Sequence, residues 1–127
     1  MDYPTELRYT KDHEWLRTDG ERITIGITTH AQKELGDIVF VELPSIGAVV
    51  AAGDNLATVE SVKAVGDVLA PLPGTVVETN VELESSPQMI NEDPYGKGWI
   101  VVIETSAPAS LEDTLSAAAY RELLGES

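Results

Sequence analysis

The sequence predicts a mainly β fold in which two small antiparallel sheets pack on each other as a small sandwich or flattened barrel. Short β-like runs alternate with turns rich in glycine and proline along most of the chain. Residues 41–56 (VELPSIGAVVAAGDNL) align with residues 68–83 (VLAPLPGTVVETNVEL) at a constant offset of 27 residues. Aromatic residues make up only 6% of the chain, so Val, Ile, Leu and Ala are expected to fill the core. The 127 residues fit one domain, residues 1–127, with a core over about residues 22–104.

The internal repeat predicts two similar halves related by an approximate two-fold axis. Its aligned positions are Val41 and Val68, Pro44 and Pro71, Gly47 and Gly74, Val49-Val50 and Val76-Val77, Gly53 and Asn80, and Leu56 and Leu83. A β-like run follows each copy, at 56–61 and at 99–104. Lys63 lies in the segment that joins the two copies, which predicts a hairpin over residues 59–68 with this lysine at its turn.

The remaining elements follow from local signals. Residues 14–27 alternate as a β-hairpin with its turn at Asp19-Gly20. Thr28 or Thr29 then predicts the N-cap of a helix over 29–35, and Gly36 its end. A strand is expected over 37–43.

Two further helical segments are expected in the second half of the chain. The insertion at 84–98 predicts one helical turn after Ser86-Pro87 and a turn over 93–96. A C-terminal helix is expected over about 110–124, with Ser110 and Asp113 as a capping box and Gly125 at its end.

Charge and composition exclude several classes of function. A net charge of −14 disfavours binding to nucleic acid or to anionic membranes, and it favours partners with basic surfaces, although it also serves solubility. No run has the length of a membrane span, and the N-terminus lacks the pattern of a signal or transit peptide. A protein that is cytoplasmic as made, or a mature form, is expected. The chain has no Cys and two His, which predicts no disulfide and no metal site.

Two short motifs invite a catalytic or metal-binding interpretation. Ser61 and Lys63 have the S-x-K spacing of a nucleophile and its base, but neither a following helix nor an oxyanion-hole signal accompanies them. Asp12-His13-Glu14 lacks the second His of H-E-x-x-H, because position 17 is Arg. A surface loop with a capping role is the favoured interpretation of these three residues.

Lys63 is the more informative candidate. Its neighbours Val62 and Ala64 are small and apolar, unlike ordinary turn residues, and Glu60 and Asp67 stand on either side. A solvated turn lysine is the simple interpretation. A lysine at the tip of a tight turn is also well presented for covalent modification by another enzyme, and acylation would remove its charge and extend its reach.

The residues around Lys63 resemble the lipoyl attachment site of the glycine cleavage system H protein. The matching motif is ESVKA at 60–64, followed by D-V-x-x-P-x-x-G at 67–74. Segments 9–16 (YTKDHEWL), 26–44 (GITTHAQKELGDIVFVELP) and 90–99 (INEDPYGKGW) resemble the same family. Lipoyl domains of 2-oxoacid dehydrogenases usually carry Asp-Lys-Ala, and biotin carriers usually carry Met-Lys-Met. The chain departs from the family at Gly66, where Ser is frequent, and at Ala70.

The resemblance implies a lipoyl-domain-like barrel-sandwich hybrid and a non-catalytic carrier, with lipoate joined to Lys63 as an amide. The arm would accept an aminomethyl group from the pyridoxal-phosphate-dependent glycine decarboxylase (P protein). It would present this group to the tetrahydrofolate-dependent aminomethyltransferase (T protein), and dihydrolipoyl dehydrogenase (L protein) would reoxidise it. An alternative is a relay that donates lipoate to other lipoyl domains, through the same lysine. A monomer is expected.

The resemblance also implies roles for neighbouring residues. Lipoylating enzymes would recognise the hairpin through Glu60, Ser61, Val62, Ala64 and Gly74. A purely structural role is the alternative for Glu60 and Gly74, and it is the favoured interpretation of Gly74. A cleft holding the loaded arm would place carboxylates against its cationic amine. Glu14 and Asp67 are the candidates for these contacts, with Asp12 as a third.

Overall fold

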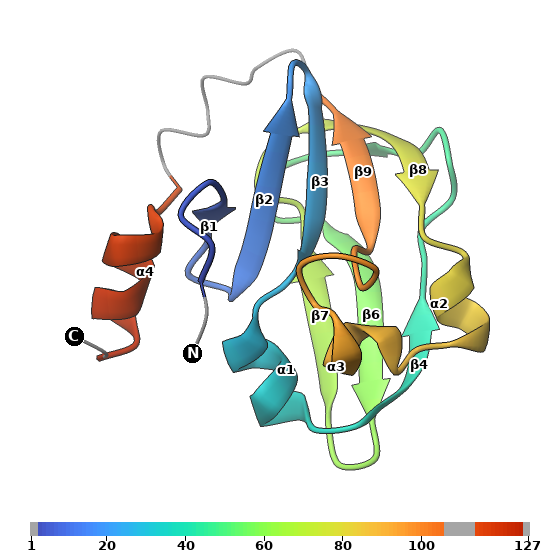
Figure 1. The fold of residues 1–127 in the computed structure, drawn as a ribbon. Coiled ribbons are helices and arrows are strands. Elements are labelled where there is room, and N and C mark those ends of the chain that lie inside the picture. The colour runs from blue at the N-terminus through green and yellow to red at the C-terminus, as the bar shows by residue number, and fades with distance from the viewer. Residues whose placement is uncertain (1–2, 106–113, 126–127) are drawn as a thin grey trace.

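The computed structural model describes residues 3–105 and 114–125, and its nine described strands form two antiparallel sheets (Figure 1). The six-stranded sheet has the spatial order β1 (Arg8–Tyr9), β2 (Glu14–Asp19), β3 (Arg22–Ile27), β9 (Val101–Glu104), β8 (Gly74–Thr79) and β5 (Val49–Val50). The three-stranded sheet has the order β4 (Ile38–Glu42), β6 (Asn55–Ser61) and β7 (Val65–Leu69). The described helices are α1 (Thr29–Leu35), α2 (Glu82–Ser85), α3 (Met89–Glu92) and α4 (Ala117–Leu123). The predicted mainly β fold of two antiparallel sheets is confirmed.

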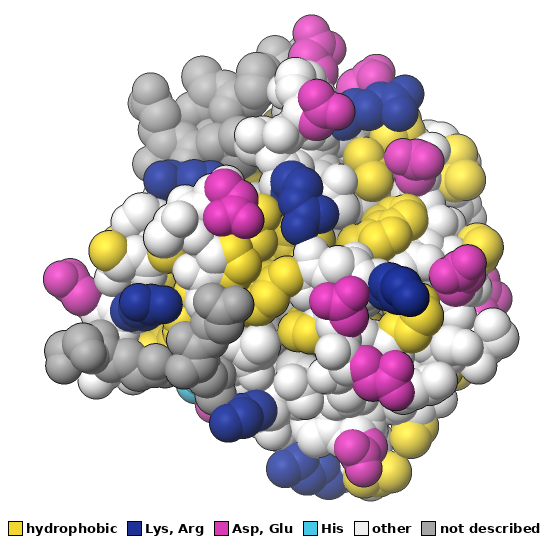
Figure 2. Space-filling model, viewed as in Figure 1, with side chains coloured by type: hydrophobic (Ala, Val, Ile, Leu, Met, Phe, Trp, Pro, Cys, Tyr) yellow, Lys and Arg dark blue, Asp and Glu magenta, His cyan; other side chains and the backbone are white. Residues whose placement is uncertain are grey.

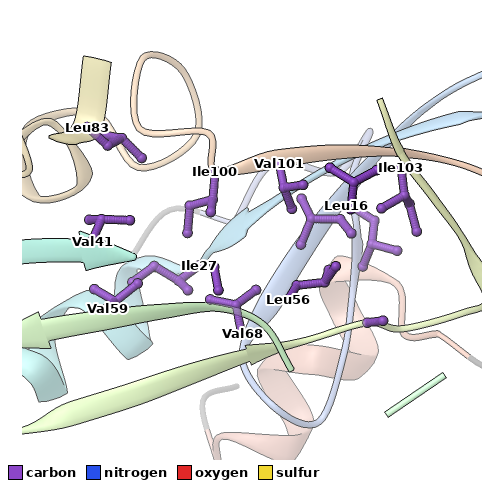
Figure 3. Close-up of a cluster of buried hydrophobic side chains, with 14 of the residues drawn as sticks. Leu16, Ile27, Val41, Leu56, Val59, Val68, Leu83, Ile100, Val101 and Ile103 are labelled. Atoms are coloured by element: carbon purple, nitrogen blue, oxygen red, sulfur yellow. The ribbon is translucent and has the colours of Figure 1, made fainter. Parts of the chain in front are cut away.

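An aliphatic core fills the space between the two sheets. Figure 3 shows Leu16 of β2 and Ile103 of β9 on one side of this core, with Val59 of β6 and Val68 of β7 on the other. These side chains are at most 1% exposed. Burial of this kind contributes roughly 2 kcal/mol for each side chain, so the core is the main attraction between the sheets.

A second, aromatic cluster was not predicted from composition. All the aromatic residues except Phe40 gather in it, namely Tyr3, Tyr9, Trp15, Tyr95, Trp99 and Tyr120. The rings of Tyr9 and Tyr120 stack with centroids 5.0 Å apart. Because Tyr120 belongs to α4 and Tyr9 to β1, this stacking holds the C-terminal helix against the first strand. Figure 1 shows α4 beside β1.

The internal repeat corresponds to the way in which the two sheets are built. The first copy supplies β4, β5 and β6, and the second supplies β7 and β8, with β9 following its insertion. Val49 pairs with Thr75 between β5 and β8, and the N–H of Val76 donates to the oxygen of Ala48 at 2.8 Å. Val49 and Val76 are related by the offset of 27 residues, and so are Ala48 and Thr75. The repeat therefore maps the Val49–Thr75 contact onto the Val76–Ala48 contact, as a local two-fold axis requires. The symmetry ends at Leu83, which lies in α2, whereas its counterpart Leu56 lies in β6.

Local signals predicted the first hairpin and α1 correctly. Gly20 lies in the turn of the β2–β3 hairpin with a φ of +63°. Thr28 caps α1, because its Oγ1 accepts a hydrogen bond from the Ala31 N–H at 3.3 Å, and Gly36 follows the helix with a φ of +85°. One helical turn, α3, follows Ser86-Pro87 as expected, whereas α2 was not predicted.

The predicted start of the C-terminal helix is wrong. In the structure α4 begins at Ala117, and Ser116 is its N-cap, with Oγ accepting from the Ala119 N–H at 3.1 Å. Leu115 instead exchanges two backbone hydrogen bonds with Tyr9, at 2.7 and 2.8 Å. The expected capping box at 110–113 lies outside the described residues. The longest helices described have 7 residues, and none of them is suited to crossing a membrane.

Candidate functional site

Lys63 lies in the turn between β6 and β7, where it was predicted, and its side chain is exposed. Ser61 builds this turn, because its N–H donates to the oxygen of Ala64 at 2.8 Å. The Ser61 hydroxyl donates to the same oxygen at 3.1 Å and accepts from the N–H groups of Lys63 and Ala64, at 3.3 and 3.0 Å. Since the hydroxyl hydrogen is engaged by the backbone, Ser61 has the geometry of a turn residue and not of an activated nucleophile.

The side chain of Lys63 extends over the backbone at Gly36. A Cβ placed on Gly36 would come within 3.2 Å of Lys63 Cε, so the missing side chain provides room for the lysine stem. Among the described residues no carboxylate forms an ion pair with the Lys63 ammonium group. The Val62 N–H donates to the oxygen of Asp37 at 3.4 Å, which fastens the hairpin to the segment before β4. The lysine is therefore fixed in its backbone and free at its amine, as covalent acylation requires.

The other predicted recognition residues fall into two groups. Glu60 pairs with Phe40 and with Val65 across the three-stranded sheet, so these side chains share its outer face. Val62 is 75% exposed at the tip, and Ala64 is also exposed. Figure 2 shows hydrophobic, acidic and basic side chains together at the lower end of the molecule, around this hairpin.

Gly74 belongs to a different part of the fold. It begins β8, and a Cβ at this position would lie 2.6 Å from the backbone oxygen of Glu104 in β9. Close packing of two backbones accounts for this glycine. A role of Gly74 in recognition by lipoylating enzymes stays a prediction.

A cleft of about 240 Å³ adjoins the hairpin. Its apolar floor comes from β3, from α1 and from β6 and β7 of the hairpin, and Ala64, next to Lys63, forms part of its wall. Three carboxylates lie on its lining, those of Asp12, Glu34 and Asp67. An arm attached to Lys63 would have apolar surface along its length and negative charge beside it. Asp12 and Asp67, predicted from sequence, are thus brought together, and Glu34 was not foreseen.

Glu14 lies next to this cleft, in a second hollow of about 240 Å³ that shares Asp12. Its side chain is 1% exposed, which corrects the prediction of a surface loop at this position. The Leu69 N–H donates to Oε2 at 2.5 Å, and the Thr10 hydroxyl donates to Oε1 at 3.2 Å. Burial raises the pKa of Glu14 to about 8, against the lowering effect of the Leu69 hydrogen bond, and Asp12 raises it further. Glu14 therefore carries a proton in most molecules at neutral pH.

His13, on the lining of the first cleft, was interpreted from the sequence as part of a surface loop and was not predicted as a site residue. It is the one described non-glycine residue with a positive φ, +66°, a conformation that costs free energy and that often occurs at functional sites. Its ring lies 4.6 Å from that of His30, and its Nδ1 lies 2.7 Å from the Tyr120 hydroxyl oxygen. Residues 13, 30 and 120 are distant in sequence, so only the fold brings them together. No three His, Asp or Glu side chains within the described ranges are placed to hold a metal ion.

The fold and the site together define a class of protein: small two-sheet β proteins with an exposed lysine at the tip of a hairpin. A family model described as "Glycine cleavage H-protein" matches residues 7–127. The chain therefore belongs to the family of glycine cleavage H proteins, the carrier component of the glycine cleavage system.

Individual relatives support this assignment over the whole chain. The chain is 52% identical over 126 residues to the glycine cleavage system H protein of Staphylococcus haemolyticus, covering 99% of this chain and 100% of the relative. It is 53% identical over 123 residues to that of Carboxydothermus hydrogenoformans, covering 97% and 95%. A crystal structure of a glycine cleavage system H protein from Mycobacterium marinum superposes with a TM-score of 0.88 at 38% identity, covering 97% and 99%. The resemblance found in the sequence motifs is confirmed.

Proposed function

We propose that this protein is the lipoyl-bearing shuttle of the glycine cleavage system and that Lys63 carries lipoate as an amide. The observation that carries the proposal is the exposed hairpin lysine, whose stem lies over Gly36 and whose amine has no described carboxylate partner. When bound through Lys63, the lipoyl group would supply a redox-active disulfide as the carrier of the aminomethyl cargo.

The residues of the chain contribute geometry and charge to this role. The turn built by Ser61 keeps the attachment point rigid, so the arm is tethered at a high effective concentration for each docked enzyme. The apolar lining of the adjoining cleft would shelter the arm from water. Asp12, Asp67 and the neighbouring Glu14 are proposed to hold the cationic amine of the cargo, because a charge-assisted hydrogen bond is stronger than a neutral one.

The proposed partners are the P, T and L proteins and the lipoylating enzymes. A net charge of −14 would accelerate encounters with basic docking surfaces, and fast dissociation suits a carrier that must visit several enzymes. A lipoylating enzyme would contact the exposed hairpin residues Val62 and Ala64 and the half-buried Glu60. A relay role through the same lysine, a monomeric state and a cytoplasmic location stay predictions.

The decisive experiment is the intact mass of the protein produced with lipoate and a lipoylating enzyme. The wild type is expected to gain one lipoyl group, and Lys63→Arg is expected to gain none. Lys33→Arg is the matched control, because this exposed lysine on α1 should leave the gain intact. A wild type without a gain, or a gain that persists in Lys63→Arg, would refute the proposal.

A further inference from the structure

We propose that His13 is a positioning residue of the cleft beside the hairpin: Tyr120 holds it as a neutral imidazole, and its protonation releases a cationic cargo. The inference rests on the proposed function, because the cargo would reach this cleft on the arm of Lys63. It adds the C-terminal helix, through Tyr120, to the parts of the fold that control retention of the cargo.

A chain of three buried or half-buried groups determines which nitrogen of His13 carries the hydrogen. Thr28 Oγ1 lies 2.8 Å from the Tyr120 oxygen, which in turn lies 2.7 Å from His13 Nδ1. The Thr28 hydroxyl already accepts from the Ala31 N–H and is fully buried, so its own hydrogen needs an acceptor, which the Tyr120 oxygen supplies. The Tyr120 hydrogen is then left for His13 Nδ1. His13 accordingly carries its hydrogen on Nε2 and remains uncharged.

Two effects favour this uncharged state. Burial raises the pKa of Tyr120 above its ordinary value, so its hydroxyl remains a donor. Burial, followed by the nearby His30, lowers the pKa of His13, whereas Glu34 and Asp12 oppose this lowering. A proton on His13 would also reverse the hydrogen bond at Nδ1, because an imidazolium nitrogen can only donate.

The protonation of His13 changes the charge of the cleft. The groups that face His13 or share its cleft are Asp12 on its own loop, His30 and Glu34 on α1, Tyr120 on α4, and Asp67 on β7. Glu34 Oε1 also lies 3.0 Å from His30 Nε2. With both rings neutral, the three carboxylates present their full negative charge to an ammonium group. A positive charge on His13 cancels part of that field and repels the cargo directly.

The first test uses the unlipoylated protein and needs no partner enzyme. Proton–carbon NMR of the imidazole signals is expected to show His13 titrating below its ordinary value of 6.5. Tyr120→Phe keeps the ring that stacks on Tyr9 and removes only the hydroxyl, so it should move the His13 midpoint upward. His13→Asn assigns the signal, because Asn also tolerates a positive φ. An unmoved midpoint in a folded Tyr120→Phe protein would overturn the hydrogen-bond argument.

The second test measures retention of the cargo. Lipoylated protein is loaded with glycine and glycine decarboxylase and then isolated. Hydrolysis of the cargo consumes one water and yields formaldehyde, ammonium and the free thiol. Wild type and His13→Asn should release formaldehyde at equal rates at pH 8. At pH 5.5 the wild type should release formaldehyde about tenfold faster than His13→Asn. This is the factor expected if the cargo and the proton on His13 change each other's binding by one pKa unit.

The outcomes separate the two proposals. A protein that takes up no lipoyl group, or that cannot be loaded, contradicts the proposed function. If both proteins load normally, and release from wild type and from His13→Asn depends on pH in the same way, only the positioning role of His13 is contradicted.

Discussion

Replacing Glu14 with Gln is expected to stabilise the protein progressively as the pH rises. The Glu14 side chain is 1% exposed, and burial raises its pKa from an ordinary value of 4.5 to about 8. Below pH 4.5 the carboxyl group is protonated in the folded and in the unfolded chain. Between pH 4.5 and about 8 only the folded chain keeps the proton, so unfolding releases it and stability falls with increasing pH.

The magnitude follows from linkage. Each pH unit of this interval lowers the free energy of unfolding by about 1.4 kcal/mol, which amounts to about 3 kcal/mol at pH 7. Above the folded pKa the total loss is at most about 5 kcal/mol. Gln is neutral at every pH, and its amide oxygen can still accept from the Leu69 N–H. The variant should therefore lack this loss of stability.

Urea unfolding followed by tryptophan fluorescence between pH 5 and pH 8 measures the effect. The gap in free energy between Glu14→Gln and wild type should widen by about 3 to 4 kcal/mol over this range. Glu78→Gln removes the same charge from an exposed position on β8 and is the matched control. A gap that is the same at pH 5 and at pH 8 would refute the reasoning, whatever its absolute size.

Three further predictions concern packing, capping and the cleft. A Cβ on Gly26 would lie 2.6 Å from the Trp15 ring, so Gly26→Ala should destabilise by about 1–3 kcal/mol in urea unfolding. Gly66→Ala, whose Cβ would meet Leu35 at 3.4 Å, should change stability little, and equal losses for the two variants would contradict this. Thr28→Val should cost about 1–2 kcal/mol in the same assay, because it removes the α1 cap and the hydrogen bond to Tyr120; an unchanged midpoint would show that neither contributes. Asp67→Asn and Glu14→Ala should each speed release of formaldehyde from the loaded protein severalfold relative to Glu78→Gln, and rates equal to this control would remove them from the cleft.

The sequence predicted those parts of the fold whose causes are local or repeated. The helix over 29–35 was identified with its cap and its terminating glycine, because all its signals lie within nine residues of chain. The 27-residue repeat predicted both the two-sheet design and the hairpin at Lys63. The start of α4 was misplaced because Leu115 pairs with Tyr9, a contact across more than a hundred residues that overrides a plausible capping pattern.

The residues of the candidate site also differ in whether their surroundings come from nearby or from distant parts of the chain. Lys63 and its turn are local features, and the sequence located them. The burial of Glu14 depends on Leu69, and the surroundings of His13 depend on His30 and Tyr120, which come from distant parts of the chain. A carboxyl group and an imidazole carry no sign in the sequence of how deeply they will be buried, so their altered pKa values could not be foreseen.

Glu14 and His13 act in the same direction on a cationic cargo. An ammonium group brought near Glu14 would lower its pKa, so docking should expel a proton at pH 7 and become tighter as the pH rises toward 8. His13 weakens retention of the cargo as the pH falls, because protonation gives its ring a positive charge. Proton release on docking can be measured by calorimetry of loading in two buffers that differ in ionisation enthalpy. The decarboxylation that loads the arm exchanges protons equally in every variant, so the contribution of Glu14 is the difference between variants. Near pH 7, Glu14→Gln should release fewer protons than wild type, whereas His13→Asn should release as many. A release unchanged in Glu14→Gln would assign the proton to another group.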